Sequence, residues 1–221
     1  MTEIESDLRR TAPEPDHLPD LSQAAAAAGL LDVAYATLDS PVGPLLVATT
    51  PRGLIRIAYV DHADQDAVLE HLAVSVSPRI MAAPRRLDEP RRELEEYFAG
   101  RRRHFDLPVD WQLTRGFARR VLQATSKIPY GATATYKQMA AQAGSPRGSR
   151  AAGNALGSNP IPIVVPCHRI LHSGGGLGGY TGGLEKKRLL LGVEGYSTLK
   201  QPYSTNSGLT TWWPSASRMS C

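Results

Sequence analysis

The sequence predicts an α+β protein in which an antiparallel sheet with helices precedes a mostly helical part. Strand-like runs separated by turns lie between residues 33 and 60, whereas helical patterns dominate after residue 114. The hydrophobic content of 42% is that of a globular protein, and we find no apolar stretch long enough to cross a bilayer. We therefore expect no membrane partner.

The first part of the sheet is predicted as a meander of three strands. Val33–Leu38, Leu45–Thr49 and Leu54–Val60 have strand composition. The segments between them, 39–44 and 51–53, contain the proline and glycine that favour turns. Strands that follow one another at this spacing are expected to pair in antiparallel fashion.

Two helices and a linker follow the meander. Gln65–Leu72 and Pro90–Phe98 have helical composition, and Leu94, Tyr97 and Phe98 fall at helical spacing, for which we adopt a plain packing role. The segment Gly100–Pro108 reads as a linker. Its three consecutive arginines are interpreted as an exposed boundary loop rather than a phosphate contact.

The second half predicts a helix-turn-helix. A helix with an apolar stripe begins after Thr114 and ends near Lys127. Thr135 is placed to cap a helix over 136–143, and Gly144-Ser145-Pro146 ends it before a second short helix over 147–156. The second helix is rich in small residues, which either let its backbone approach a groove or let it pack on another helix. The residues alone leave both open. A final helix is expected over 184–191.

One interior cysteine is the candidate nucleophile. Cys167 follows the apolar run Ile161–Val165 and precedes a histidine, and the only other cysteine of the chain is its last residue. A lone cysteine beside a histidine is typical of a reactive thiol, since the thiolate is the nucleophilic form. The glycine-dense segment 173–183 lacks the Lys-Ser/Thr pair of a phosphate-binding loop and is expected to wall a pocket.

Net charge and cysteine content limit which partners and which cellular compartment are expected. The net charge is +4, and basic residues gather at Arg115, Arg119, Arg120 and Lys127 and near the cysteine at Arg147, Arg150 and Arg169. On charge alone, a solvated basic surface is favoured over a polyanion site. Two distant cysteines and an acidic start that does not fit a secretory signal predict a cytoplasmic protein.

The segment from Phe117 to Gly195 resembles the C-terminal domain of the O6-alkylguanine-DNA alkyltransferases, also called methylated-DNA–protein-cysteine methyltransferases. The resemblance rests on six ordered pieces: Ile128-Pro129-Tyr130-Gly131, Tyr136-Lys137-Gln138-Met139-Ala140, Arg150-Ala151-Ala152-Gly153-Asn154-Ala155, Asn159-Pro160-Ile161-Pro162, Pro166-Cys167-His168-Arg169 and Gly179-Tyr180-Thr181-Gly182-Gly183-Leu184. Residues 33–100 are similar to the more variable N-terminal domain of that family.

The resemblance implies a fold and a division of the chain. It implies a ribonuclease H-like N-terminal domain over 32–108 and a C-terminal domain with a winged helix-turn-helix over 109–196. Residues 1–31 are expected to be an unplaced extension and residues 197–221 a flexible tail.

The resemblance also implies a reaction. The protein is expected to bind double-stranded DNA as a monomer and to flip an O6-alkylguanine into a pocket. The alkyl group then passes irreversibly to the cysteine, one event per molecule. No cofactor and no metal are expected. O4-alkylthymine is a further candidate substrate, and the sequence does not set the preferred size of the alkyl group.

Five residues carry the implied chemistry. Cys167 is the acceptor, His168 the base that draws its proton through water, and Glu194 the carboxylate behind that base. Asn159 braces the turn that holds the cysteine. Tyr136 aids rotation of the nucleotide and donates a proton to the leaving guanine.

The implied DNA contacts come mainly from the second helix of the helix-turn-helix. Arg150 is expected to fill the space left by the flipped base, because its planar cation can stack and still meet polar edges. The remaining expected DNA contacts are Thr135, Ala151, Gly153, Asn154 and Arg169. The expected pocket residues are Tyr180, Thr181 near the guanine oxygen, and Val165 and Pro162 as apolar walls; the backbone of Val165 and Arg169 is expected to meet base edges. Gly148-Ser149 departs from the family pattern and is expected to loosen the start of this helix.

Three other functions compete with this one. A cysteine hydrolase or acyltransferase would use the same cysteine and histidine but would turn over. A non-enzymatic protein that only binds alkylated DNA would lack the acceptor cysteine, which is present here. A plain helix-turn-helix regulator would not need it.

Overall fold

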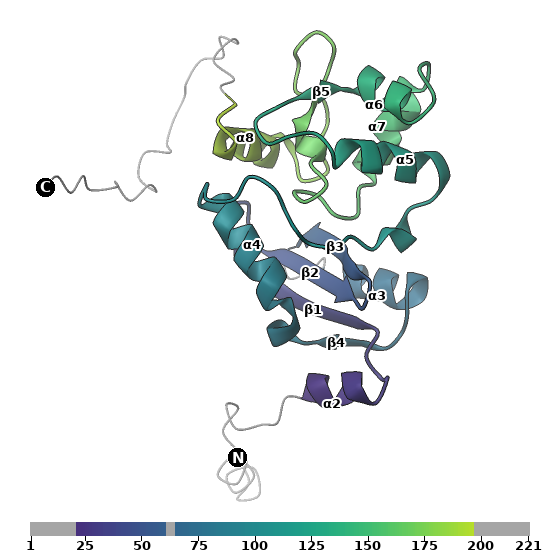
Figure 1. Cartoon of the computed structure of the whole chain (residues 1–221), viewed down its shortest axis with the longest axis vertical. Helices are drawn as coiled ribbons and strands as arrows, with labels where there is room; N and C mark the ends of the chain where they lie inside the picture. Colours follow the sequence, from purple (N-terminus) through teal and green to yellow (C-terminus); the bar gives the residue numbers. More distant parts are fainter. Residues whose placement is uncertain (1–20, 61–64, 197–221) are drawn as a thin grey trace, which may run out of the picture.

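The computed structural model describes residues 21–60 and 65–196. Figure 1 shows a sheet with its covering helices at one end of these residues and a group of helices at the other end. Within the described ranges no helix combines the length and the apolar character that a bilayer crossing requires. The α+β class predicted from the sequence is confirmed.

The sheet has four strands in the order β3-β2-β1-β4. β1 (Val33–Leu38), β2 (Leu45–Thr50) and β3 (Gly53–Tyr59) form the predicted antiparallel meander. β4 (Ile80–Ala82) was not predicted and pairs with β1 in parallel, so the sheet is mixed and the expectation of a purely antiparallel sheet is wrong for this strand. The chain reaches β4 through α3 (Gln65–Ser75), the crossover that a parallel pairing needs.

Both faces of the sheet are covered. α4 (Asp88–Phe98) covers one face and α3 the other (Figure 1). Alternate residues of β2 point to opposite sides: Leu45 and Val47 belong to the apolar cluster on the α4 side, whereas Leu46 and Ala48 belong to the cluster on the α3 side. Burial on both faces explains why the first four residues of this strand are all apolar.

The first described helix packs on this core. α2 (Leu21–Ala27) places Ala25 and Ala26 against the main apolar cluster, and Leu31 is buried in it. The expected N-terminal extension over 1–31 is therefore partly joined to the core. Residues 1–20 and the expected tail over 197–221 lie outside the described residues.

The helical part of the chain contains α5 (Gly116–Thr125), α6 (Tyr136–Gln142), α7 (Ser149–Gly157) and α8 (Leu184–Val193), and β5 (Ala134–Thr135) pairs with β6 (Ile170–Leu171) in parallel. α6 and α7 form the predicted helix-turn-helix. The predicted cap is confirmed, since the Thr135 hydroxyl accepts from the backbone of Gln138 in a complete capping box.

The turn before α7 explains the unusual Gly148. A Cβ on this residue would lie 2.7 Å from the Ser145 hydroxyl and 3.1 Å from its carbonyl oxygen. α7 begins at Ser149, directly after this close approach. Gly148 therefore permits the tight turn before α7, and the expected loosening of the helix start stays a prediction.

Edge strand β3 joins the sheet to the rest of the chain. On its outer edge, Leu54 N donates to Pro108 O at 2.8 Å, and Ile57 N donates to Pro160 O at 2.9 Å. Leu54 O accepts from Asp110 N at 2.8 Å. Figure 1 shows β3 as the strand nearest the helical part. The sheet therefore contacts both the linker and the segment that precedes the cysteine.

Candidate active site and nucleic-acid interface

Cys167 begins a short 3₁₀ helix, η4 (Cys167–Arg169), at the end of a buried loop. In this loop Ile163 has φ 75°, and it is the one non-glycine residue in 21–60 and 65–196 with a positive φ. A left-handed backbone is strained for a β-branched residue and persists only where the surroundings enforce it. The loop that presents the cysteine is thus held by its contacts and not by local preference.

Asn159 supplies several of those contacts. Its amide nitrogen donates to Val165 O at 2.8 Å and to the Cys167 Sγ at 3.1 Å. Its amide oxygen accepts from Ile161 N at 3.0 Å. The structure therefore places Asn159 across the turn, as the predicted brace requires, and adds a direct contact with sulfur.

The environment keeps the thiol protonated. Burial raises the pKa of Cys167 to about 11, although the Asn159 hydrogen bond and the positive charge of Lys187 act in the opposite direction. Only a small fraction of such a thiol is ionised near neutral pH. Reaction at this sulfur therefore needs a base to remove the proton.

His168 is placed to be that base. Its Nε2 lies 2.8 Å from Glu194 Oε1, and both side chains are buried. Because an ionised carboxylate only accepts hydrogen bonds, Nε2 carries the ring proton and donates it. The buried Nδ1 has no protein partner in the described chain. Burial lowers the pKa of His168, which leaves this Nδ1 as a free lone pair.

Glu194 is the C-cap residue of α8, and its carboxylate accepts hydrogen bonds from three other segments. His168, Tyr97 and Arg169 reach Oε1 at 2.7 to 2.8 Å, and Gly131 N reaches Oε2 at 3.2 Å. Burial alone would raise the pKa of this carboxyl, but the hydrogen bonds from His168 and Arg169 outweigh it and lower the pKa to about 2. Glu194 is therefore ionised although it is buried.

Arg169 is part of this cluster and not of the surface. Its Nε and Nη2 donate to Glu194, its Nη1 donates to Ile128 O, and the residue is buried. A buried guanidinium that is already paired in this way does not extend to a phosphate, so the side chain serves the cluster. A contact through its backbone stays a prediction.

Two functional side chains were missed by the sequence analysis. Tyr97 was assigned to plain packing, yet its hydroxyl donates to Glu194. Lys187 is buried and donates from Nζ to Ile170 O at 2.6 Å and to Leu177 O. The available signal was a lysine on the face of α8 that also carries the buried Leu190 and Leu191.

The cysteine opens into a pocket of about 640 Å³. Its walls come from the start of α6, from α7 and from the glycine-rich loop, and its lining includes six of the predicted site residues: Tyr136, Arg150, Gly153, Asn154, Tyr180 and Thr181. The volume suits a small organic ligand. Val165 and Pro162 are buried and are not among the residues that line this pocket, so their assignment as walls stays a prediction.

Glycines keep the pocket loop close to its neighbours. Gly178 has φ +67°, and a Cβ there would lie 2.6 Å from the Tyr136 hydroxyl. The Thr181 hydroxyl donates to Gly157 O at 2.8 Å, which ties the loop to the end of α7. The loop thus forms a defined wall opposite α7.

α7 separates a buried face from an exposed one. Ala152, Ala155 and Leu156 are buried, whereas the exposed residues are Arg150, Ala151, Asn154 and Gly157. The buried small residues therefore serve packing, and the approach of the exposed face to a groove stays a prediction. Thr135 lies at the start of α6, where its hydroxyl is used by the helix cap, and its DNA contact stays a prediction.

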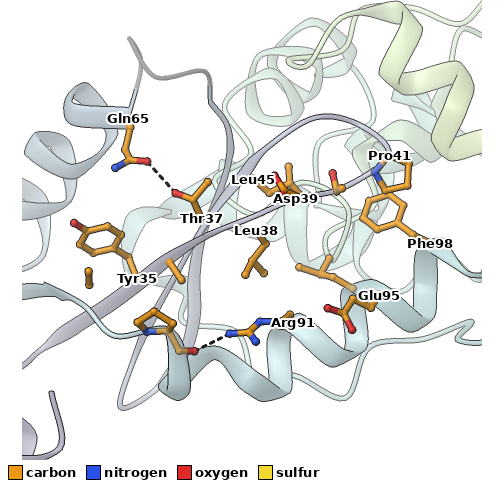
Figure 2. Close-up of a pocket in the computed structure, with 15 residues that line it drawn as sticks. Tyr35, Thr37, Leu38, Asp39, Pro41, Leu45, Gln65, Arg91, Glu95 and Phe98 are labelled. Atoms are coloured by element: carbon orange, nitrogen blue, oxygen red, sulfur yellow. Dashed lines mark hydrogen bonds between the residues drawn. The ribbon is translucent and has the colours of Figure 1, made fainter. Parts of the chain in front are cut away.

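A second cavity lies away from this chemistry. It measures about 730 Å³ and lies between β1 and α4, with Tyr35, Leu45 and Phe98 among its lining residues (Figure 2). None of the predicted site residues lines it. We therefore place the active site at Cys167.

Known proteins are similar to this chain over most of the described residues. Residues 116–196 match the family model described as "6-O-methylguanine DNA methyltransferase, DNA binding domain", and residues 33–111 match its ribonuclease-like domain. A methylated-DNA–protein-cysteine methyltransferase of Mycolicibacterium paratuberculosis is 39% identical over 162 residues, which cover 73% of this chain and 92% of that protein.

The chain belongs to the methylated-DNA–protein-cysteine methyltransferase family. The constitutive enzyme of Bacillus subtilis is also similar, with 36% identity over 163 residues that cover 72% of this chain and 94% of that protein. A crystal structure of Mycobacterium tuberculosis OGT in complex with DNA matches with a TM-score of 0.61 and 36% identity, covering 73% of this chain and 93% of that one. The family resemblance stated from the motifs is confirmed.

Glu194→Gln tests the electrostatic role of the buried carboxylate. Its pKa is lowered from 4.5 to about 2, so its contribution to stability is present above about pH 4.5 and is lost as the pH falls through about 2. A shift of this size corresponds to about 3 kcal/mol. We expect the free energy of unfolding, measured in urea at a series of pH values, to fall more steeply with decreasing pH in the unmodified protein than in the variant.

Glu185→Gln is the matched control, because Glu185 is an exposed glutamate of the same helix. In Glu185→Gln the free energy of unfolding should depend on pH as it does in the unmodified protein. If the same pH dependence is found in Glu194→Gln, the Glu194 carboxylate is not ionised within the cluster.

The raised thiol pKa predicts a distinctive pH dependence of labelling. In Cys221→Ser, which leaves one thiol, labelling by iodoacetamide should rise about tenfold per pH unit from about pH 7 to about pH 9 without levelling off, because the thiolate fraction rises in that way below the pKa. Stopped labelling followed by mass measurement gives the rates. A plateau near the pKa of an ordinary thiol would contradict the buried-thiol assignment.

Proposed function

We propose that this protein repairs DNA by moving the alkyl group of an O6-alkylguanine base onto Cys167 in one irreversible step. The observation that carries the proposal is the pocket that places Cys167 beside the exposed face of α7. A nucleophile at this position meets a base only if the base leaves the duplex stack. The names of the relatives and the DNA complex of the mycobacterial protein support the same activity.

The proposed transfer balances without a further reactant. His168 Nδ1 takes the thiol proton through a water molecule, and Glu194 stabilises the resulting imidazolium. The sulfur attacks the saturated carbon of the alkyl group, and the electron pair of the broken carbon–oxygen bond stays on guanine. Guanine gains a proton from Tyr136, whose raised pKa keeps its hydroxyl protonated at neutral pH. Tyr136 then regains a proton from solvent and His168 releases the thiol proton to solvent, so that no proton is gained or lost overall. The lesion itself supplies the alkyl group.

Arg150 and its neighbours would open the duplex. Arg150 is exposed at the start of α7 and also lines the pocket, so it can fill the gap while the base enters. Flipping costs a few kcal/mol and is least costly for a damaged base, which favours lesions. In this proposal residues 109–196 carry the reaction, residues 32–108 support them, and one copy of the chain acts as a monomer. O4-alkylthymine is a second candidate substrate for the same pocket.

The product explains why the protein would act once. A thioether formed on Cys167 offers water no activated carbonyl to attack, unlike the thioester of a cysteine hydrolase. Each molecule would therefore remove one alkyl group. This distinguishes the proposal from a hydrolase or acyltransferase.

Intact-mass measurement tests the transfer. After incubation with duplex DNA that contains O6-methylguanine, we expect the mass to rise by one methyl group, located on Cys167 by peptide mapping. Cys167→Ala should gain nothing, whereas Cys221→Ser should gain the same methyl group. An unchanged mass with the lesion still present would rule out the proposal, and sustained turnover of a thioester would favour a hydrolase.

Arg150→Ala tests the opening of the duplex. We expect the variant to lose much more activity on O6-methylguanine in duplex DNA than on free O6-benzylguanine, because the free base needs no flipping. Single-turnover rates on the two substrates give the ratio.

Arg85→Ala is the matched control, since Arg85 is an exposed arginine on the 3₁₀ helix η2 (Pro84–Leu87) next to β1. It should leave both rates unchanged. Equal losses on the two substrates in Arg150→Ala would assign Arg150 to the pocket alone.

A further inference from the structure

Edge strand β3 of the N-terminal sheet contacts both sides of the active site. Ile57 N donates to Pro160 O at 2.9 Å, next to Asn159, which holds the cysteine loop. Two residues further on, the hydroxyls of Tyr59 and Tyr180 lie 2.6 Å apart. One short strand therefore connects the turn before Cys167 with the loop on the opposite wall of the pocket.

The pocket loop rests on the ring of Tyr59. The rings of Tyr59 and Tyr180 meet edge to face, with centroids 6.1 Å apart. A Cβ on Gly182 would lie 2.7 Å from the Tyr59 ring, so the glycine permits this close approach. The Lys186 ammonium lies 4.6 Å from the centre of the same ring. Three successive parts of the loop and of α8 thus take their position from Tyr59.

Tyr180 contacts the groups that would react. It lines the pocket with Cys167, and its ring meets that of His168 edge to face at 6.5 Å. Burial raises the pKa of both tyrosines, so each hydroxyl keeps its proton and the pair holds one hydrogen bond in either direction. This bond holds the hydroxyl end of Tyr180 against β3 and so restricts where its ring can lie in the pocket wall.

We propose that Tyr59 is a positioning residue for alkyl transfer, which holds Tyr180 in the pocket wall through their shared hydrogen bond. This inference rests on the proposed function. It assigns the N-terminal sheet a part in the reaction, although no residue of that sheet lines the pocket. Tyr59 does not touch the substrate and acts through Tyr180.

Tyr59→Phe is the decisive variant because it removes the hydroxyl and keeps the ring under Gly182 and Lys186. Single-turnover transfer is measured against the concentration of duplex DNA containing O6-methylguanine, which separates the limiting rate from the apparent affinity. We expect the limiting rate to fall about three- to tenfold, the usual effect of one hydrogen bond, while the affinity is unchanged. Tyr35→Phe is the control, since Tyr35 lies in β1 of the same sheet and lines the other cavity.

A double-mutant cycle separates positioning from simple packing. If Tyr59 acts through Tyr180, then Tyr180→Phe and the double variant should be slowed to a similar degree, because both remove the same bond. Additive losses, a loss of affinity alone, or an unchanged limiting rate in Tyr59→Phe would overturn the inference. So would a rate loss that only follows a loss of stability, measured as the free energy of unfolding.

The unmodified protein keeps this test separate from that of the proposed function. If it gains no methyl group from the lesion, the proposed function fails. If it is methylated and Tyr59→Phe reacts at the same rate, only the role of Tyr59 fails.

Discussion

The buried carboxylate of Glu194 is the constraint on which the site depends. A charge in the interior is costly unless donors surround it, and here the donors come from α4, from the turn at Gly131 and from η4. Satisfying one carboxylate therefore fixes three segments that are distant in the sequence. It also sets which nitrogen of His168 carries the proton. Fold and chemistry are determined by the same cluster of hydrogen bonds.

Burial gives the thiol a low resting reactivity. A pKa of about 11 for Cys167 keeps the sulfur protonated, and the walls of the pocket limit access to it. A residue that reacts once must not be lost to oxidants or stray electrophiles. The neighbouring His168, Asn159 and Lys187 would assist ionisation when a substrate fills the pocket. The thiol can therefore be unreactive in the free protein and still ionise when substrate binds, because the groups that would assist its ionisation are already beside it.

The sequence predicted the parts that depend on local pattern or on family motifs. The meander, the Thr135 cap and the juxtaposition of Cys167, His168 and Glu194 follow from such signals. β4 was missed because three residues are too few to show a period. Tyr97 and Lys187 were missed because only the tertiary structure reveals what a polar group on an apolar face contacts. The burial of the Arg169 side chain was not foreseen, because charge in a sequence does not reveal burial.

The way β3 is used also bears on aggregation. An open strand edge offers unpaired backbone groups to other chains, and β3 is long and apolar. Its outer edge bonds instead with Pro108, Asp110 and Pro160. The opposite edge of the sheet is β4, which has three residues and a proline two positions beyond each end, at Pro78 and Pro84. Cutting the chain after Pro108 would expose the part of the β3 edge that bonds with Asp110 and Pro160, so the sheet alone should self-associate where the joined chain stays dispersed.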